Sequence, residues 1–194
     1  MSLIYKVASH ADEMEQIFRL NYKTFVEEIP QHLPNEQRKL IDRYHEQNTY
    51  MIALDEQRVV AMLAIREHRP FSLDQKIADL DQHLPFRPRK MVEIRLLAIE
   101  KEYRKGQIFY ELFHFLLQHL REAAFDMAVI SGTTRELRLY QRIGFRPFAH
   151  LVGTTEAAYQ PMYITEETFS QSAASRMLQE KNRRHQTATP ERYF

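Results

Sequence analysis

Two opposite charges stand inside an apolar segment, Met91–Ile99, whose sequence MVEIRLLAI is typical of a buried central strand. In an extended strand Glu93, Arg95, Leu97 and Ile99 would share one face. Charges buried there are costly unless they are paired or used. The two charges therefore form either a structural ion pair or a site for an amine. Amines are mostly protonated at pH 7, so Glu93 could remove that proton while Arg95 orients it or binds substrate.

A positively charged turn follows this strand. Arg104 and Lys105 precede Gly106 and Gln107, and a broad apolar stripe predicts a helix over 108–124. The unsatisfied backbone N–H groups at a helix start attract anions, and the two basic residues add positive charge. Taken alone, this pattern fits either a phosphate site or an ordinary strand–turn–helix connection.

Further polar candidates precede the central strand. Asp42 and His45 are three residues apart, near the end of a short helix expected over 36–44, and would share one helical face. They either contact a substrate or simply cap and solvate that helix. Arg66 ends an apolar strand and is either a substrate ligand or an exposed strand-end residue. Phe71 could line an acyl channel, or it could be plain core.

Composition excludes several classes of protein. The 194-residue chain has 27 Lys and Arg against 26 Asp and Glu, so no global charge favours nucleic acid or an anionic membrane. Without cysteine it has no disulfide, thiolate zinc site or cysteine nucleophile, which fits a cytoplasmic protein. The nine histidines lack metal-ligand spacing, and the longest aliphatic run, Val59–Ile65, is too short to span a bilayer. We expect no metal, no nucleic acid and no membrane span.

The elements that must position these residues alternate along the chain. Helical spacing and turn signals predict five helices, over 12–29, 36–44, 73–82, 108–124 and 137–143, the last ended by Gly144. Strands are expected at 3–7, 49–54, 59–66, 91–99, 126–130, 146–152 and 159–164. This order predicts an α+β (layered α/β) fold with a largely antiparallel sheet. Residues 1–165 would form a single domain, and 166–194 a helix fraying into a polar, basic tail.

A motif near the C-terminus resembles a known superfamily. Leu139 to Pro147 read LYQRIGFRP, which resembles the LYxxxGFxx signature of the GNAT acyltransferases. The resemblance implies a splayed, mostly antiparallel central sheet flanked by helices, with an acyl thioester held between the fourth and fifth strands. It implies that Tyr140 is the acid that protonates the leaving thiolate, and that the donor lies along Leu97, Ile99, Arg104, Lys105, Gly106, Gln107 and Ile108. The glycine pattern of this loop departs from the superfamily's, which leaves both acyl-coenzyme A and the phosphopantetheine arm of a carrier protein open as donors.

A narrower resemblance covers the N-terminal half. The chain is similar to autoinducer synthases and related N-acyl amino acid synthases at Phe25-Val26-Glu27-Glu28, Asp42-Arg43-Tyr44-His45, Arg66 and Glu93-Ile94-Arg95-Leu96. It departs from the autoinducer synthases at Asn21, where they favour arginine, and at His45, where they favour aspartate. These departures argue against a lactone product more strongly than against a general N-acyl transfer.

The sequence thus predicts an N-acyltransferase. It would move an acyl group from acyl-coenzyme A or acyl carrier protein to the primary amine of a small molecule such as an amino acid. The predicted catalytic residues are Glu93 and Tyr140, and the predicted substrate-binding residues are Asp42, His45, Arg66, Arg95 and Phe71. No permanently bound cofactor is expected. The alternative is a catalytically silent GNAT-like module that binds an acyl ligand or a protein. Chain length of the acyl group and oligomeric state are left open.

Overall fold

The computed structural model describes residues 3–104, 107–154, 158–177 and 179–180. These residues form two compact units, each assembled from separate stretches of chain. The first unit takes its residues from Met1–Ser72 and Lys90–Phe125, and the second from Leu73–Arg89 and Asp126–Phe194. All of the polar acceptor candidates near the central strand belong to the first unit, whereas Tyr140 belongs to the second.

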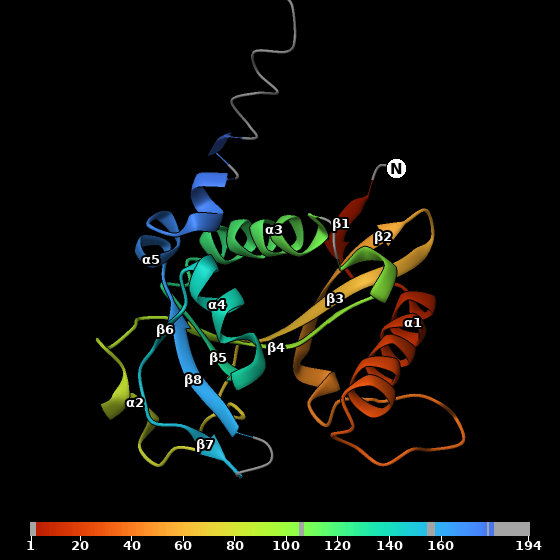
Figure 1. The fold of residues 1–194 in the computed structure, drawn as a ribbon, viewed down its shortest axis with the longest axis horizontal. Helices are drawn as coiled ribbons and strands as arrows, with labels where there is room; N and C mark the ends of the chain where they lie inside the picture. The colour runs from red at the N-terminus through yellow and green to blue at the C-terminus, as the bar shows by residue number, and fades with distance from the viewer. Residues whose placement is uncertain (1–2, 105–106, 155–157, 178, 181–194) are drawn as a thin grey trace, which may run out of the picture. The chain divides into compact units, whose positions relative to one another are not determined.

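Four antiparallel strands form the sheet of the first unit (Figure 1). They are β1 (Ile4–Val7), β2 (Asn48–Asp55), β3 (Arg58–Arg66) and β4 (Met91–Ile99), hydrogen-bonded in that order. A tight turn joins β2 to β3, as the sequence predicts, with Glu56 at a φ of 56°. The bounds of β4 match the predicted strand at both ends.

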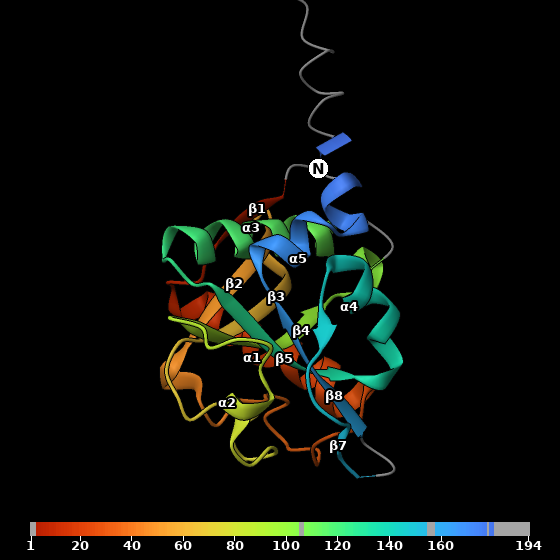
Figure 2. The same ribbon diagram turned by 90° about the vertical axis from the view of Figure 1, so that its left-hand side faces the viewer.

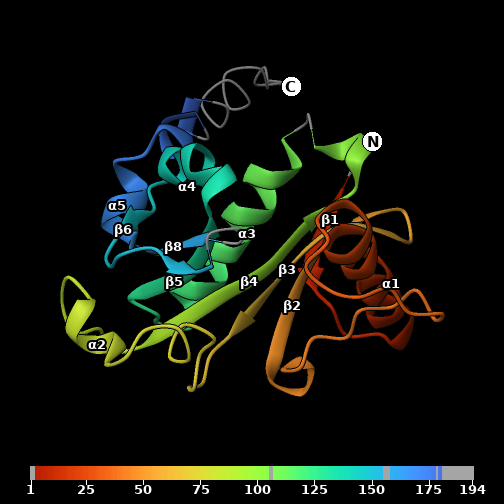
Figure 3. The same cartoon turned by 60° about the horizontal axis from the view of Figure 1, so that its bottom comes forward.

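Two helices cover opposite faces of this sheet (Figure 3). Helix α1 (Ala11–Tyr22) contacts β3 and β4, and α3 (Ile108–Glu122) contacts β1, β2 and β3. A π-helical segment, Lys23–Glu28, extends α1 to just before Pro30, where the sequence predicts the helix to stop. The expected α+β fold, with antiparallel pairing and flanking helices, is confirmed.

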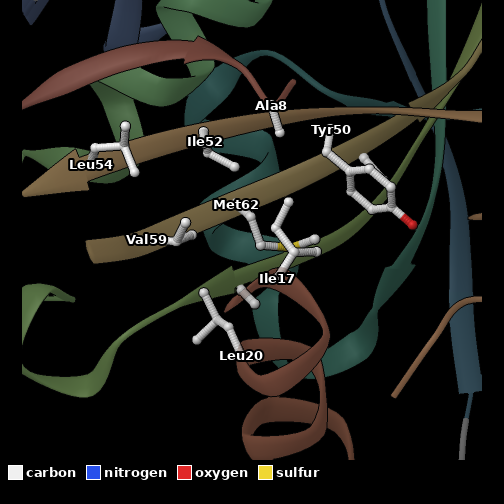
Figure 4. Packing of buried hydrophobic residues seen from close by; sticks show 10 residues of the cluster. Ala8, Ile17, Leu20, Tyr50, Ile52, Leu54, Val59 and Met62 are labelled. Atoms are coloured by element: carbon white, nitrogen blue, oxygen red, sulfur yellow. The ribbon is translucent and has the colours of Figure 1, made fainter. Parts of the chain in front are cut away.

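Apolar side chains of α1 pack against one face of the sheet (Figure 4). Ile17 and Leu20 of the helix meet Tyr50, Ile52 and Met62, all of them nearly inaccessible to solvent. The register pairs Tyr50 with Ala64 and Ile52 with Met62, so these side chains share one face of β2 and β3. This packing fixes the position of the sheet face next to which the polar residues lie.

A β-bulge interrupts β4 in the middle. Met62 pairs with Ala98 and Ala64 pairs with Arg95, so two residues of β4, Leu96 and Leu97, oppose one of β3. Leu96 has a φ of 53°, a left-handed conformation that a branched side chain rarely adopts. The expected common face of Glu93, Arg95, Leu97 and Ile99 is therefore wrong beyond Arg95, since the extra residue reverses the alternation.

A buried carboxylate anchors the start of α1. Burial disfavours the charge of Glu13, but Lys6 Nζ donates to it at 2.7 Å and the backbone amides of Ser9 and His10 donate at 2.8 and 3.1 Å. These bonds outweigh the burial and lower the pKa of Glu13 to about 2 from 4.5. Such a group stabilises the fold above its unfolded pKa and loses that contribution as the pH falls through its folded pKa.

We expect Glu13→Gln to lower the free energy of unfolding by about 2 kcal/mol at pH 7, because one pKa unit corresponds to about 1.4 kcal/mol and the amide keeps part of the hydrogen bonding. The deficit should shrink from about pH 5 downward and nearly vanish by about pH 2, where wild-type Glu13 is itself being protonated. Urea unfolding at a series of pH values measures this. Asp12→Asn, in the first turn of the same helix but exposed, is the control. A deficit that stays constant with pH would contradict the assignment.

The second unit is built around β8 (Ala158–Ile164), which pairs antiparallel with β5 (Met127–Thr133). Two short strands, β6 (Arg146–Pro147) and β7 (Val152–Gly153), pair with opposite ends of β8 (Figure 2). Helix α4 (Leu137–Ile143) ends at Gly144, whose φ of 110° confirms the predicted left-handed cap. Two further helices, α2 (Leu80–His83) and α5 (Glu166–Ser170), are short, and residues 173–177 are also helical. Residues 181–194 of the predicted basic tail lie outside the described residues.

Three predicted elements are wrong. Residues 36–44 form turns and extended backbone instead of a helix, and a one-turn 3₁₀ helix follows at His45–Gln47. The helix expected over 73–82 is reduced to α2, and the strand over 146–152 is split into β6 and β7. Two further one-turn 3₁₀ helices, Lys101–Tyr103 and Thr134–Glu136, precede α3 and α4. No helix among the described residues is both long and apolar enough to cross a membrane.

Candidate active site

The sheet register of the first unit aligns three polar residues on neighbouring strands. Asn48 of β2 pairs with Arg66 of β3, which in turn pairs with Glu93 of β4. One step along the same face, Arg95 of β4 follows Glu93 and pairs with Ala64. Alternation along each strand thus directs these polar side chains to the face that α1 covers farther along the sheet.

Asp42 and Arg95 form the best-defined ion pair of this cluster. Arg95 Nη2 lies 2.9 Å from Asp42 Oδ1, and the two side chains are only 14% and 8% exposed. The second oxygen of Asp42 accepts hydrogen bonds from Asn48 Nδ2 at 2.7 Å and from the Tyr44 backbone amide at 3.2 Å. Both oxygens of Asp42 are therefore engaged within the protein, and its main effect is to fix Arg95.

Glu93 is held by Ser72, at the end of the loop that follows β3. The Ser72 hydroxyl donates to Glu93 Oε1 at 2.6 Å, and the Ser72 backbone amide donates to Oε2 at 2.8 Å. Arg95 Nη1 lies farther away, 3.7 Å from Oε2. Because the Glu93 side chain is 1% exposed, these contacts keep a buried carboxylate in one orientation next to a guanidinium.

His45 joins the cluster through Tyr50. Its Nδ1 lies 3.2 Å from the Tyr50 hydroxyl, to which Asn48 Nδ2 also donates at 3.3 Å, and its ring packs edge-on against Phe18. Burial raises the pKa of the Tyr50 phenol, so this hydroxyl stays protonated at neutral pH. Asp42 and His45 are thus connected through Asn48 and Tyr50, and not by a common helical face as the sequence predicts.

Several buried guanidinium groups keep unused hydrogen-bond donors. Arg66 is 2% exposed; its Nε donates to the His68 carbonyl at 2.9 Å, while its Nη1 has no hydrogen-bond partner among the described residues. Arg95 Nε and Nη1 are likewise without a hydrogen-bond partner there. Unpaired donors on buried cations are costly, and the contacts of a bound anion would offset that cost. The cluster thus combines a held carboxylate, Glu93, with donors suited to a carboxylate ligand.

The predicted donor residues follow the bulge of β4. Leu97 belongs to the bulge, a feature that leaves one residue outside regular ladder pairing. The Ile99 carbonyl accepts from Arg104 Nε at 2.7 Å, and Arg104 Nη2 lies 2.5 Å from Glu28 Oε2. The guanidinium of Arg104 is thus partly neutralised by Glu28, an acidic partner that the sequence analysis did not assign.

The rest of the predicted donor loop is only partly described. Lys105 and Gly106 lie outside the described residues. Gln107 precedes α3 without a capping side-chain bond, and the Ile108 side chain is buried in the core. Either residue could therefore meet a donor phosphate chiefly through its backbone N–H group.

Two further candidates from the sequence are Phe71 and Tyr140. Phe71 is 1% exposed, and Arg69 lies over its ring, so it belongs to the packed interior of the first unit. In the second unit, burial raises the pKa of Tyr140, which keeps its phenol protonated as an acid requires. Gly132 makes room for that ring, because a Cβ there would lie 2.9 Å from it. The acid role of Tyr140 stays a prediction.

The sequence analysis missed four contributors to this cluster: Ser72, Asn48, Tyr50 and Tyr44. Ser72 is followed by glutamine three residues later, a spacing typical of a helix cap, whereas its hydroxyl binds Glu93. Asn48 and Tyr50 alternate at the start of a strand, a spacing that could have identified them as sharing the face of Arg66.

Comparisons with known proteins identify the family and support the fold. The model of the family "N-acyl amino acid synthase FeeM" matches residues 16–166. The structure of FeeM from uncultured soil microbes is 16% identical, with a TM-score of 0.68 over 91% of this chain and 97% of that one. BjaI, a CoA-dependent acyl-homoserine lactone synthase solved with SAM and isopentyl-CoA, is 19% identical, with a TM-score of 0.73 over 87% of each chain. A search of curated protein sequences gives no significant match.

These structural likenesses support the fold, and the synthase LasI adds to them with a TM-score of 0.70 at 14% identity over 88% of this chain and 96% of that one. The family match spans the elements that carry the polar cluster, from α1 through β4, and continues to the end of β8. The chain therefore belongs to the N-acyl amino acid synthase family represented by FeeM, and it is an acyltransferase that transfers an acyl group to an amine.

Proposed function

We propose that this enzyme acylates the α-amino group of a free amino acid, using an acyl thioester of a pantetheine arm as donor. The observation that carries the proposal is the juxtaposition of Glu93, held by Ser72, with the unpaired donors of Arg66 and Arg95. An α-amino acid carries its ammonium and its carboxylate on the same carbon atom. The ammonium suits Glu93, and the carboxylate suits a pair of planar guanidinium forks.

The chemistry requires that the amine first lose a proton. Glu93 is the group placed to accept it, after which the nitrogen attacks the thioester carbonyl. As the C–N bond forms, the carbonyl oxygen becomes an oxyanion and the nitrogen becomes cationic. The nitrogen then loses its second proton, the tetrahedral oxyanion collapses, the C–S bond breaks, and the leaving sulfur takes up that proton and departs as a thiol. A backbone N–H group at the Leu96–Leu97 bulge is a suitable donor to that oxyanion, because the bulge leaves one residue outside regular pairing.

Product analysis tests this function directly. We would incubate the protein with acyl-coenzyme A thioesters of several lengths, or with acylated carrier protein, and the twenty amino acids. Mass spectrometry should then detect an N-acyl amino acid and free thiol in equal amounts. Matched amines that lack the carboxylate should be much poorer acceptors. Amide formation with other amines but with none of the amino acids would contradict the proposed acceptor, and equal use of the decarboxylated amines would contradict a carboxylate site at Arg66 and Arg95.

The donor end of the proposal can be tested at Arg104. We expect acyl-coenzyme A to raise the melting temperature of the protein by linkage. Arg104→Glu should weaken that binding about 10- to 100-fold, because a charge-assisted hydrogen bond contributes about 1.5–3 kcal/mol. Titration of the thermal shift with the thioester gives the apparent affinity.

Arg38→Glu is the matched control for this variant. Arg38 is also an exposed arginine paired with a glutamate, since its Nη2 lies 2.5 Å from Glu27 Oε1, and it stands outside the donor loop. Its charge reversal should leave donor affinity nearly unchanged. If Arg104→Glu behaves like Arg38→Glu, the donor phosphate binds elsewhere.

A further inference from the structure

The ring of Tyr44 is surrounded by arginines. The Cζ of Arg66 lies 3.7 Å from its centroid, that of Arg95 lies 4.7 Å away, and that of Arg43 lies 4.6 Å away. Tyr44 stands in the segment between α1 and β2, and its backbone amide donates to Asp42. The loop therefore ties this ring to the same carboxylate that fixes Arg95.

The Tyr44 ring offsets the electrostatic repulsion between two neighbouring arginines. Arg66 and Arg95 come from neighbouring strands, and both side chains are largely buried, so their like charges repel across a short gap. An aromatic face attracts guanidinium groups, by about 2 kcal/mol or more where the pair is desolvated. Among the described residues Arg66 has one hydrogen bond from Nε and none from Nη1, so the Tyr44 ring is a second contact that orients its fork.

We propose that Tyr44 is a positioning residue, whose ring holds Arg66 and Arg95 so that their unpaired N–H groups converge on the acceptor's carboxylate. This inference rests on the proposed function, since it assumes that the carboxylate of an amino acid is the anion bound. It assigns the effect to the aromatic face and not to the phenolic hydroxyl. Tyr44 thereby determines specificity for acceptors that carry a carboxylate without touching the reacting atoms.

Two substitutions separate the ring from the hydroxyl. Tyr44→Phe keeps the aromatic face and should stay within roughly twofold of wild type in acceptor KM. Tyr44→Leu removes the face and should raise the KM for the amino acid about 10-fold or more, with a smaller effect on kcat, because the contact exists before and during the reaction. The affinity for the acyl donor should not change. With the decarboxylated amine as acceptor, Tyr44→Leu and wild type should be equally slow.

A purely structural role would give a different result. Tyr5→Leu, at a half-buried tyrosine of β1 outside the polar cluster, controls for loss of an aromatic side chain. It should lower stability without changing acceptor KM. If Tyr44→Leu merely lowers the melting temperature and leaves the KM for the amino acid at the wild-type value, the inference is wrong. The same holds if Tyr44→Phe is as defective as Tyr44→Leu.

A spectroscopic readout keeps the inference testable apart from activity. A guanidinium stacked on a ring experiences a ring current, so the Nε–Hε resonance of Arg66 should be shifted upfield in a ¹⁵N-correlated spectrum, with Arg66→Lys giving its assignment. The shift should persist in Tyr44→Phe and disappear in Tyr44→Leu. If the Arg66 resonance is shifted but the protein acylates no amino acid, the contact between Arg66 and Tyr44 is supported and only the proposed function is wrong. An unshifted resonance in wild type would overturn the inference itself.

Discussion

Glu93→Gln should lower kcat for amide formation about 100- to 1,000-fold while the protein remains folded. The amide has the same shape and can still bind Ser72, but it cannot accept the proton that the attacking amine must lose, and general-base catalysis typically contributes a factor of this size. The residual rate of the variant should rise about 10-fold per pH unit up to the pKa of the free amine, because only the neutral amine reacts. Steady-state kinetics between about pH 6 and pH 10 measures both effects.

The control is Glu27→Gln, which removes a carboxylate paired with Arg38 at the surface of the first unit. This variant should keep the wild-type rate and pH profile. Two alternatives for Glu93 were left open by the sequence, a structural ion pair and a catalytic base. A Glu93→Gln enzyme that loses stability but turns over at the wild-type rate would decide for the structural alternative.

The boundaries of β4 could be predicted, but its bulge could not. An apolar run bounded by polar turns defines a strand, and the match to Met91–Ile99 reflects that pattern. A bulge is usually signalled by glycine, the residue that tolerates positive φ, whereas here a leucine, Leu96, takes that conformation. Pairing with β3 and packing of Leu96 against the α1 core impose it, and neither interaction is visible in the local sequence.

The prediction of a helix over residues 36–44 failed for the opposite reason. Local signals suggested a helix, but tertiary contacts override them. The Leu40 amide donates to the Phe18 carbonyl of α1 at 3.0 Å, and the side chain of Asn21 reaches the Leu40 carbonyl at 3.4 Å. Farther on, Asp42 is drawn to Arg95 of β4. These contacts hold the segment extended along its neighbours, and they deliver Asp42 and Tyr44 to the cluster more directly than a helix would.

The charged residues of the acceptor site were easier to predict than the neighbouring residues that hold them in place. Glu93 and Arg95 stand out as charges in an apolar strand, whereas Ser72 has an ordinary polar environment in sequence and gains its meaning only from the distance to Glu93. Polar residues in loops have many possible partners, and loop closure decides among them. The same argument applies to Tyr44, whose role is visible only once three guanidinium groups surround it.

Asp42→Asn should lower the free energy of unfolding by about 2–3 kcal/mol, because it removes the shorter ion pair of a largely buried guanidinium and leaves Arg95 only the longer contact with Glu93, at 3.7 Å. The substitution weakens the contact between Asp42 and Arg95, whose side chains are both mostly buried. The double variant Asp42→Asn/Arg95→Met should be clearly more stable than the sum of the two single effects predicts, since it removes both charges. Urea unfolding of the four proteins gives the coupling free energy.

Kinetics of the same four proteins decides what Asp42 does for the acceptor. Both of its oxygens are already bound to Arg95, Asn48 and the Tyr44 amide, so we expect Asp42 to act chiefly by holding Arg95 and not by contacting the acceptor. The double variant should then have an acceptor KM no higher than that of Arg95→Met alone, because the residue that Asp42 positions is already gone. Fully additive losses in acceptor binding would show instead that Asp42 binds the amino acid itself, and the ammonium would then be shared between Asp42 and Glu93.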